Sequence, residues 1–397
     1  MAHNSTRSSC ERPAYYRETK VKTSPSSTES TPAAPDGRRR VLLLCGGRSS
    51  EHEVSIRSCL SVYRAIDRSL FSPLVTGIGR DGVWRFYGDT EAFALDGDDP
   101  AKVRLAPGGK VCMPGRTAGG AVLLMEDGGT KECFDLAFPV LHGAFGEDGS
   151  IQGLFAMLSV PYVGCDFTSS ANCMDKELTK LIVAADGFRT ARAVTLRRGK
   201  SFDSAAIVGK LGLPLFVKPA KTGSSVGISK VKGVGELHAA VNAAFACDDK
   251  VLVEECVVGR EIECAVLEDA GGSLFVAHPG EVVPHEEFYS YSAKYLNADG
   301  ATLHVSAELS DGEVSEVRQL AARAFRALGC SGFSRIDFFL TATGFVLNEV
   351  NTIPGFTNIS LYPQMMASSG IPYAELITRL LRNAEWNYSC REALAQK

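Results

Sequence analysis

Two apolar runs near the carboxyl end of the chain, residues 335–340 and 347–351, constrain its fold more than any other feature. Each run reads as a strand; Asp337 lies in the first, and Glu349 and Asn351 lie two residues apart in the second. A strand puts residues two apart on one face, so all three side chains can face one point if the runs pair as a hairpin. Carboxylate and amide oxygens suit Mg²⁺, which keeps few protein ligands and shares its other positions with water and phosphates. The hairpin therefore predicts a site for a nucleotide and its metal ion.

A loop rich in glycine and serine follows another predicted strand and is the candidate phosphate loop. Residues 218–227 read Lys-Pro-Ala-Lys-Thr-Gly-Ser-Ser-Val-Gly. Small residues let backbone N–H groups approach phosphate oxygens and leave the loop mobile enough to act as a lid, while Lys218 can reach in as a point charge. The spacing is not that of a Walker A motif. Taken alone, the loop would read as a surface hairpin, so its assignment depends on the metal hairpin downstream.

Two further segments can complete a nucleotide site. Lys176, near the start of a predicted helix, would be a second phosphate cation, although a solvated surface lysine is the ordinary interpretation. Residues 251–261 read as a strand followed by a linker, whose exposed backbone can contact an adenine edge and whose acidic side chains can hold ribose hydroxyls. A plain domain hinge is the alternative for this linker.

Two loops are candidates for the substrate side. His142 follows a buried predicted strand, and loops at strand ends border ligand crevices in α/β sheets, although a structural histidine is the alternative. Residues 288–295 place three tyrosines and Lys294 in a long polar loop. Such a loop in a compact domain is more often a functional lid than a simple anchor.

The composition is that of an ordinary globular protein, with 397 residues of which 45% are hydrophobic. This length predicts two or three domains. The net charge of −4 implies no broad nucleic-acid-binding surface, and no apolar run approaches the roughly 18 residues that span a membrane. Twelve cysteines lack C-x-x-C spacing, and several lie inside apolar patterns, which favours reduced core thiols in a cytoplasmic protein over disulfides or metal sites.

The order of apolar runs and turn residues predicts an α/β fold with a mostly parallel sheet. Residues 1–38 are rich in Ser, Thr, Pro and Arg without a hydrophobic period, which predicts a disordered tail. A first strand over 41–45 ends in a glycine turn, after which Ser49 or Ser50 is expected to cap a helix that runs to Asp67. The other expected helices cover 152–158, 170–186, 234–246 and 311–328, and the other expected strands cover 74–78, 83–86, 122–125, 136–140, 193–196, 215–218, 225–231, 251–254, 261–267 and 274–283.

Taken together and in this order, these motifs resemble the D-alanine–D-alanine ligases of the ATP-grasp superfamily. The resemblance spans roughly residues 40–385, and its motifs cover 46–55, 142–149, 174–176, 218–227, 253–255, 291–295, 334–337 and 348–355. It implies an ATP-grasp fold preceded by a Rossmann-like N-terminal domain, with ATP held between the second and third domains. The implied domains cover 39–164, 165–257 and 258–390.

The resemblance also implies roles for residues at the matching positions. The ATP-binding set comprises Lys176, Lys218 and Ser225 at the phosphates, Glu254 and the backbone near Val257 at the adenine, Glu261 at the ribose, and Lys294 beside the transferred phosphoryl group. Two Mg²⁺ ions, for which Mn²⁺ can substitute, would be held by Asp337, Glu349 and Asn351.

The substrate and catalytic residues follow from the same resemblance. Glu51 would receive the ammonium of the first D-alanine, and a hydrogen-bonded set of Glu51, Ser224 and Tyr295 would close the lid. The acyl-transfer oxyanion would lie against Arg335 and the Gly355 N–H, and the substrate site would also include His142, Ser360 and Leu361.

The implied reaction is ATP-dependent ligation of two D-alanines through a D-alanyl phosphate, in peptidoglycan precursor synthesis. Its partners would be small molecules only, in a cytoplasmic homodimer without nucleic acid or membrane. The loop around Tyr295 is similar to the dipeptide-making type, whereas residues 350–357 and 362–367 also resemble ligases that join D-alanine to D-lactate. The alternatives are therefore a D-alanine–D-lactate or D-alanine–D-serine ligase, a ligase for another amino acid or carboxylate, and a non-catalytic nucleotide-binding protein on the same fold. Cys256 stands where an aromatic residue is common beside adenine.

Overall fold

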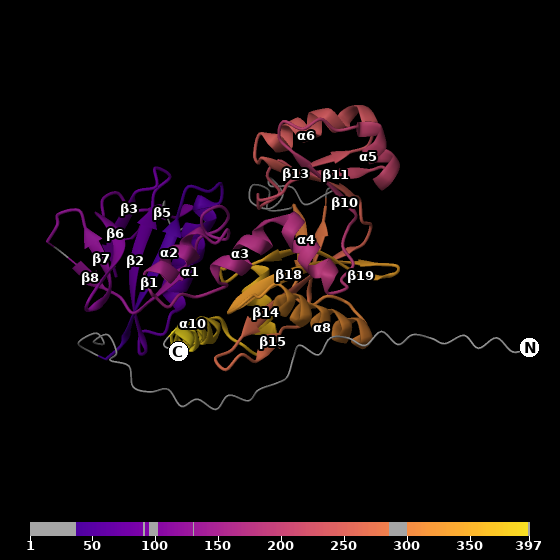
Figure 1. Cartoon of the computed structure of the whole chain (residues 1–397). Helices are drawn as coiled ribbons and strands as arrows, with labels where there is room; N and C mark the ends of the chain where they lie inside the picture. The colour runs from indigo at the N-terminus through magenta and orange to yellow at the C-terminus, as the bar shows by residue number, and fades with distance from the viewer. Residues whose placement is uncertain (1–36, 90–91, 95–101, 130, 286–299, 396–397) are drawn as a thin grey trace, which may run out of the picture. The chain divides into compact units, whose positions relative to one another are not determined.

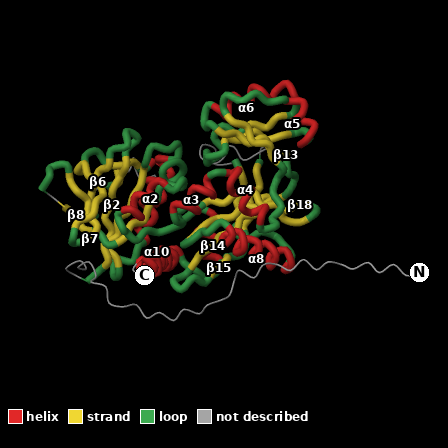
Figure 2. The backbone as a smooth tube through the Cα atoms, in the orientation of Figure 1, coloured by secondary structure: helices red, strands yellow, loops and turns green. Residues whose placement is uncertain are grey.

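The computed structural model describes residues 37–89, 92–94, 102–129, 131–285 and 300–395, whose strands form three large sheets and a two-stranded one (Figures 1 and 2). Both helices and several sheets are present along these residues, so the expected α/β class is confirmed. The tail expected over 1–38 lies outside the described residues except for its last two, and the expected lid loop over 288–295, with Lys294 and Tyr295, lies outside them entirely. No helix within the described ranges is both long and apolar enough to cross a membrane.

The first sheet is mixed, so the expectation of a mostly parallel sheet is wrong. Its seven strands run in the order β8-β7-β6-β3-β2-β1-β9, and only β1 pairs in parallel with its neighbours, β2 and β9. The other pairs are antiparallel because short loops such as residues 118–119 permit hairpins, whereas a parallel pair needs a long crossover. The strands are β1 (Arg39–Gly46), β2 (Phe71–Ile78), β3 (Trp84–Gly88), β6 (Lys110–Thr117), β7 (Gly120–Met125), β8 (Lys131–Cys133) and β9 (Leu136–Pro139), and the short pair is β4 (Phe93–Ala94) with β5 (Arg104–Leu105).

The second sheet has four antiparallel strands in the order β10-β13-β11-β12. They are β10 (Ala193–Arg197), β11 (Leu215–Pro219), β12 (Ser229–Val231) and β13 (Lys250–Glu255). Helices α5 (Ser204–Leu211) and α6 (Leu237–Phe245) cover one face of this sheet, and the short 3-10 turn η2 (Val234–Glu236) precedes α6 (Figure 1). The strand expected over 225–231 begins only at Ser229, because Ser224 and Ser225 adopt left-handed backbone with φ of 52° and 58°.

The third sheet contains the predicted metal hairpin. Its main path is β17-β16-β14-β18-β19, with β15 paired to β14. The strands are β14 (Arg260–Glu268), β15 (Leu274–Val276), β16 (Gly280–Pro284), β17 (Ala301–His304), β18 (Phe333–Thr341) and β19 (Gly344–Asn351), and the helices are α8 (Asp311–Ala327), α9 (Leu361–Ser368) and α10 (Tyr373–Ala395). The single strand expected over 274–283 is two strands that follow one edge of β14 in the same direction and are interrupted at residues 277–279, where Pro279 has no N–H to donate to the sheet.

Two helix boundaries differ from the expected ones. The helix expected over 170–186 is two helices, α3 (Phe167–Met174) and α4 (Lys176–Ala185), because Asp175 is extended and its side chain caps α4. Helix α1 (His52–Ala65) is not capped by Ser49 or Ser50. The Ser49 hydroxyl instead donates to the carbonyl of His142, which ties the turn after β1 to the turn after β9. Helix α2 (Ser150–Met157) lies close to its expected range.

The largest buried cluster joins the first sheet to the carboxyl-terminal helices. Phe356 is fully buried, and its ring lies 5.7 Å from that of Phe138 on β9 and 5.4 Å from that of Phe333 on β18. Tyr362 on α9 and Tyr373 on α10 complete the group, with ring centroids 6.0 and 5.5 Å from Phe356. This cluster holds the segment after β19 in place, next to the candidate site.

Candidate active site

One cleft of about 330 Å³ gathers every candidate site residue that lies within the described ranges. These residues come from all three large sheets and from the loops between them. They are Glu51, His142, Lys176, Lys218, Ser224, Ser225, Glu254, Val257, Glu261, Arg335, Asp337, Glu349, Asn351, Gly355, Ser360 and Leu361. Residues from positions 51 to 361 thus meet in one place, as a composite site requires.

The predicted hairpin forms, and its register brings the three expected ligands together. Asp337 on β18 lies opposite Glu349 on β19, and the Asn351 amide donates to the Asp337 carboxylate at 3.0 Å. The register shifts at Asp337, where β19 carries one extra residue, Asn348. Such bulges re-aim side chains beside active sites.

The donor set of this hairpin fits Mg²⁺. Two carboxylates and one amide are hard oxygen donors, and rotation of the Asn351 amide turns its oxygen toward the carboxylates. Within the described residues, no group of three or more His, Cys, Asp or Glu side chains is arranged to hold a metal ion. An ion here would therefore take its remaining ligands from water and from nucleotide phosphates, as Mg²⁺ does.

Arg335 is buried among carboxylates at the base of the hairpin. Its guanidinium donates two hydrogen bonds to Asp337, at 2.8 and 2.7 Å, and its Nε lies 2.9 Å from Glu263 Oε2. Burial alone would lower the pKa of Arg335, but Asp337 and Glu263 outweigh it and raise that pKa, so the group is charged. Glu263 was not among the candidates. Its spacing two residues after Glu261 on a predicted strand, and hence on the same face, is the signal that could have found it.

Lys218 and Glu254 are paired to each other at the nucleotide end of the cleft. Lys218 Nζ lies 2.8 Å from Glu254 Oε2, and Lys180 Nζ from α4 lies 3.0 Å from Glu254 Oε1. Burial would raise the pKa of Glu254, but the two lysines outweigh it and lower that pKa to about 2. Lys180 was not a candidate, and its place one helical turn after Lys176 was the available signal. Glu254 is therefore an ionised carboxylate between two ammonium groups.

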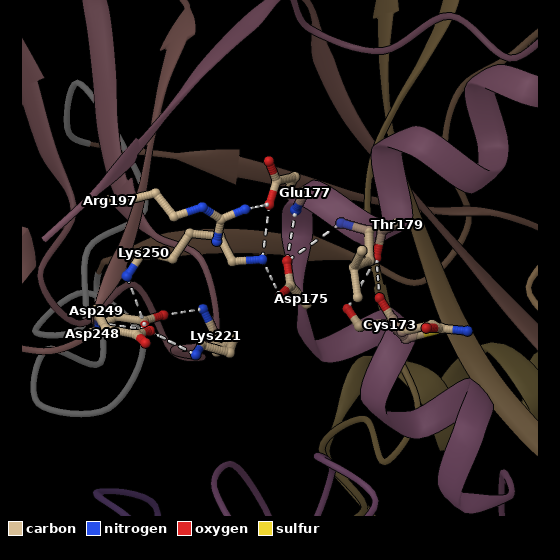
Figure 3. A network of polar contacts seen from close by, with 11 residues as sticks. Cys173, Asp175, Glu177, Thr179, Arg197, Lys221, Asp248, Asp249 and Lys250 are labelled. Carbon is tan, nitrogen blue, oxygen red and sulfur yellow. Dashed lines mark hydrogen bonds and ion pairs between the residues drawn. The ribbon is translucent and has the colours of Figure 1, made fainter. Parts of the chain in front are cut away.

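Lys176 is the first residue of α4, and a network of polar contacts around Asp175 and Glu177 holds this end of the helix (Figure 3). Asp175 caps the helix by accepting from the N–H groups of Glu177 and Leu178, at 3.1 and 3.3 Å. Lys250 on β13 donates to the Asp175 carboxylate and, at 2.8 Å, to that of Glu177 (Figure 3). The first turn of α4 is thereby fixed to β13.

The same turn of helix contacts the candidate phosphate loop directly. The Lys176 N–H donates to the carbonyl of Ala220 at 3.0 Å, and Lys176 Nζ donates to the carbonyl of Thr222 at 2.9 Å. On the far side of the loop, the Lys221 N–H donates to Asp248 at 2.6 Å (Figure 3). The predicted phosphate loop and the predicted second phosphate lysine are thus held side by side.

Glu51 faces the tip of the phosphate loop. The Ser224 hydroxyl donates a hydrogen bond to the Glu51 carboxylate; Tyr295, the third member of the expected lid-closing set, lies outside the described residues, and the lid-closing role of the set stays a prediction. Gly143 permits the approach, because its φ is 71° and a Cβ there would lie 2.5 Å from Glu51 Oε2. Glu51 itself is buried, with an exposed fraction of 7%.

His142 and Glu147 fix the loops around Glu51. The two ring nitrogens of His142 contact the Ser58 hydroxyl and the Ile353 carbonyl, each at 3.0 Å, which favours the structural interpretation of this histidine; its substrate role stays a prediction. Glu147, which was not a candidate, accepts from the N–H groups of Gly143 at 2.7 Å and Ile353 at 3.1 Å. Burial, followed by repulsion from Glu51, raises the pKa of Glu147 to about 8. Its acidic side chain within a glycine-rich loop was the available signal.

The segment before α9 also lines the cleft. Ser360 precedes the helix without capping it, and its hydroxyl instead accepts from the Thr357 N–H at 3.1 Å. Ser360 and Leu361, the first residue of α9, line the cleft, so the positive end of the helix dipole lies at the cleft. Such a helix end suits a carboxylate.

The linker after β13 lines the nucleotide end of the cleft. Val257 lies within this linker, and Glu261 is the second residue of β14. Cys256 is half-buried, and its N–H donates to the carbonyl of Pro214 at 3.2 Å. The expected adenine and ribose contacts therefore lie in one wall of the cleft.

Two models of known protein families match the chain. One, described as the D-ala D-ala ligase N-terminus, matches residues 40–165, and the other, described as the D-ala D-ala ligase C-terminus, matches residues 182–382. Together they cover most of the chain.

Individual proteins show the same likeness. D-alanine–D-alanine ligase A of Mesorhizobium japonicum is 46% identical over 356 residues, which are 87% of this chain and 97% of that protein. The solved D-alanine–D-alanine ligase of Coxiella burnetii has a TM-score of 0.77 at 32% identity, covering 90% of this chain and 97% of its own. VanG D-Ala:D-Ser ligase of Enterococcus faecalis has a TM-score of 0.72 at 34% identity, covering 87% of this chain and 99% of its own.

Proposed function

The chain belongs to the D-alanine–D-alanine ligase family of ATP-grasp enzymes and is an ATP-dependent ligase, and we propose that its cleft joins two D-alanines through a D-alanyl phosphate. The observation that carries this proposal is the convergence of the nucleotide, metal and substrate candidates on one cleft. The product would supply peptidoglycan precursor synthesis. We further propose that the enzyme is a cytoplasmic homodimer, as the family resemblance implies.

The first step transfers the γ-phosphoryl group of ATP to the carboxylate of the first D-alanine. A carboxylate is a poor acyl donor because its charge repels nucleophiles, whereas an acyl phosphate has a good leaving group. Catalysis of phosphoryl transfer is mainly positioning and charge neutralisation. Lys176 and Lys218 supply positive charge, and Ser225 and the other residues of the glycine-rich loop supply backbone N–H groups. Mg²⁺ held by Asp337, Glu349 and Asn351 would neutralise phosphate charge when bound.

The second step is attack of the neutral amine of the second D-alanine on the acyl carbon, in which the C–N bond forms, the C–O bond to phosphate breaks, and inorganic phosphate and the amine proton leave. A tetrahedral oxyanion develops, and we assign its stabilisation to Arg335 and the Gly355 N–H, which line the same cleft. One such donor contributes about 3–4 kcal/mol to a transition state. Glu263 and Asp337 hold the Arg335 guanidinium in one orientation before the charge appears.

Both substrates are held by charges that match their own. Glu51 would bind the ammonium of the first D-alanine, and its contact with Ser224 would draw the glycine-rich loop over the acyl phosphate and exclude water. The carboxylate of the second D-alanine would lie against Ser360 and the Leu361 N–H at the start of α9. Both sites lie in the lining of one cleft, as the joining of the two amino acids requires.

The second substrate is a separate question from the fold. The likeness to a D-Ala:D-Ser ligase shows that this architecture accommodates more than one acceptor. The greater identity to a D-alanine–D-alanine ligase favours D-alanine here. A non-catalytic nucleotide-binding protein is disfavoured, because Arg335, Lys218 and the carboxylates of the hairpin all line the cleft.

ADP release tests the proposal directly. The purified full chain is incubated with ATP, Mg²⁺ and D-alanine, then with D-lactate or D-serine added, and the products are identified by mass. Dominant D-alanyl-D-alanine at neutral pH is the expected result. A dominant mixed product would move the chain to the D-lactate or D-serine alternative, and no ADP release would overturn the proposal in favour of a non-catalytic protein.

A further inference from the structure

Lys180 shares one carboxylate with a lysine of the nucleotide site. Glu254 accepts Lys180 Nζ at 3.0 Å on one oxygen and Lys218 Nζ at 2.8 Å on the other. The three side chains come from α4, β13 and β11, and their exposed fractions are 10%, 3% and 14% in the order Lys180, Glu254, Lys218. Lys218 and Glu254 line the cleft, whereas Lys180 lies behind Glu254 and is absent from the cleft lining among the described residues.

A buried group of three charges is a costly way to pack a helix on a strand. Apolar side chains of similar volume often stabilise such a contact as well or better, because no charge has to leave water. The group has a net charge of +1, since two ammonium groups face one carboxylate. Burial alone would lower the pKa of Lys218, but Glu254, Glu349 and Glu261 outweigh it and raise that pKa, so Lys218 enters the cleft charged.

The role of Lys180 follows from what Glu254 would do in its absence. With Lys180 present, Glu254 keeps a partner when Lys218 turns toward a nucleotide. Without Lys180, that movement would leave the buried carboxylate of Glu254 without a cation to balance its charge, which is strongly unfavourable, so Lys218 would stay on Glu254. We propose that Lys180 is a positioning residue that balances the charge of Glu254 and thereby frees Lys218 for the nucleotide. This inference rests on the proposed assignment of Lys218 to ATP.

Removal of the Lys180 charge tests the idea at the level of binding. Lys180→Met should weaken binding of adenylyl imidodiphosphate with Mg²⁺, measured by titration calorimetry, by about tenfold, the size of one charge-assisted hydrogen bond. The KM for D-alanine should stay within about twofold, because the amino acid sites contact neither Lys180 nor Glu254 in the proposed arrangement. Lys180→Arg keeps the charge and should restore most of the affinity. Lys180→Gln replaces Lys180→Met if the latter does not fold.

A double-mutant cycle with Glu254→Gln separates this role from a structural one. In the Glu254→Gln background there is no buried carboxylate to balance, so Lys180→Met should no longer weaken binding of the analogue, and should improve it if repulsion between the two lysines is relieved. The matched control is Lys250→Met, which removes another buried lysine that joins β13 to α4 but contacts Asp175 and Glu177 instead. The effects of Lys250→Met and Glu254→Gln on the binding free energy of the analogue should be additive, because the two residues are not in contact in the proposed arrangement.

Each alternative outcome has a definite meaning. Unchanged analogue affinity in Lys180→Met, or an equal loss in both Glu254 backgrounds, would overturn the inference. A parallel loss of nucleotide affinity, D-alanine affinity and thermal stability, which Lys180→Arg does not restore, would assign Lys180 to packing alone. If the wild-type chain binds the analogue but releases no ADP, the proposed function fails while the binding cycle still decides the role of Lys180.

Discussion

Ser224 on the glycine-rich loop donates a hydrogen bond to Glu51 at the start of α1, across 173 residues of sequence. The contact joins the loop after β11 to the turn after β1, two segments that belong to different sheets. It forms although both serines of the loop tip hold left-handed backbone, which a non-glycine residue keeps only when its surroundings favour it. The loop is therefore already drawn toward the residue that is proposed to bind the first D-alanine.

Loss of this contact should weaken the amino acid site. Ser224→Ala removes a hydrogen bond to a buried carboxylate, so we expect kcat/KM for D-alanine to fall by about tenfold or more. Ser229→Ala, at the start of β12, is the control and should leave it within about twofold. Steady-state ADP release measures both. Equal values for Ser224→Ala and wild type would remove the lid role from Ser224.

Arg335→Ala should lower turnover by roughly 10²-fold or more, because one oxyanion donor is lost. The same change leaves Asp337 and Glu263 without their shared cation, so the variant should also unfold at lower urea concentration. Measurement of kcat at saturating substrates separates the two effects, provided that the variant is folded at the assay temperature. Turnover near that of wild type would contradict the assigned role.

Stability should depend on pH through Glu147. Its pKa is about 8 in the folded chain against an ordinary value of 4.5, so the folded state binds more protons than the unfolded state between these values. The contribution of Glu147 to stability is therefore full below about pH 4.5 and is lost as the pH rises through 8. Glu147→Gln cannot titrate, so its free energy of unfolding relative to wild type should increase over this range. Urea unfolding at several pH values measures the difference, and a flat or falling trend would contradict the raised pKa.

Activity should require a divalent ion at the β18–β19 hairpin. Removal of Mg²⁺ with a chelator should abolish ADP release, and either Mg²⁺ or Mn²⁺ should restore it. Glu349→Gln should raise the Mg²⁺ concentration for half-maximal activity by at least about tenfold, because a ligand charge is lost. Titration of Mg²⁺ at fixed ATP measures this shift. An unchanged Mg²⁺ concentration for half-maximal activity would show that Glu349 is not a ligand of the ion.

Phe356→Ala should destabilise the fold by about 3–5 kcal/mol, since it empties the centre of the aromatic cluster. Phe356 follows Gly355 directly, so D-alanine binding should weaken at the same time. The control is Ile359→Ala, at a side chain with 71% exposure, which should change stability by no more than about 0.5 kcal/mol. Urea unfolding of the two variants measures both changes in stability. Equal losses would contradict the role of Phe356 in core packing.

The metal hairpin is a feature that could be predicted from residues close together in the sequence. Apolar residues on β18 and β19 mark the strands, and the two-residue period puts Glu349 and Asn351 on one face. The same reasoning indicated the loop that carries Ser224 and the strand end that carries Lys218. These features depend on residues close together in the chain, so they can be predicted before any long-range contact is known.

Long-range contacts determined one helix boundary and the strand pairing of the first sheet, which local sequence patterns did not predict. Asp175 breaks an apparently continuous helix, because its carboxylate pairs with Lys250, 75 residues away, and caps α4 in place of continuing α3. The first sheet is mixed because strand pairing depends on loop geometry as well as on apolar runs.

The sequence by itself determined the α/β class, the position of most strands and the candidate residues for the site, because hydrophobic periodicity and short motifs can be read from residues close together in the chain. Only the tertiary structure decided which charges oppose one another: Lys180 with Glu254, Glu263 with Arg335, and Glu147 with Glu51. Glu263 and Arg335 lie 72 residues apart in the chain, Lys180 and Glu254 lie 74 apart, and Glu51 and Glu147 lie 96 apart. Electrostatic energy depends on the distance between charges and on their burial, and both quantities are known only from the tertiary structure.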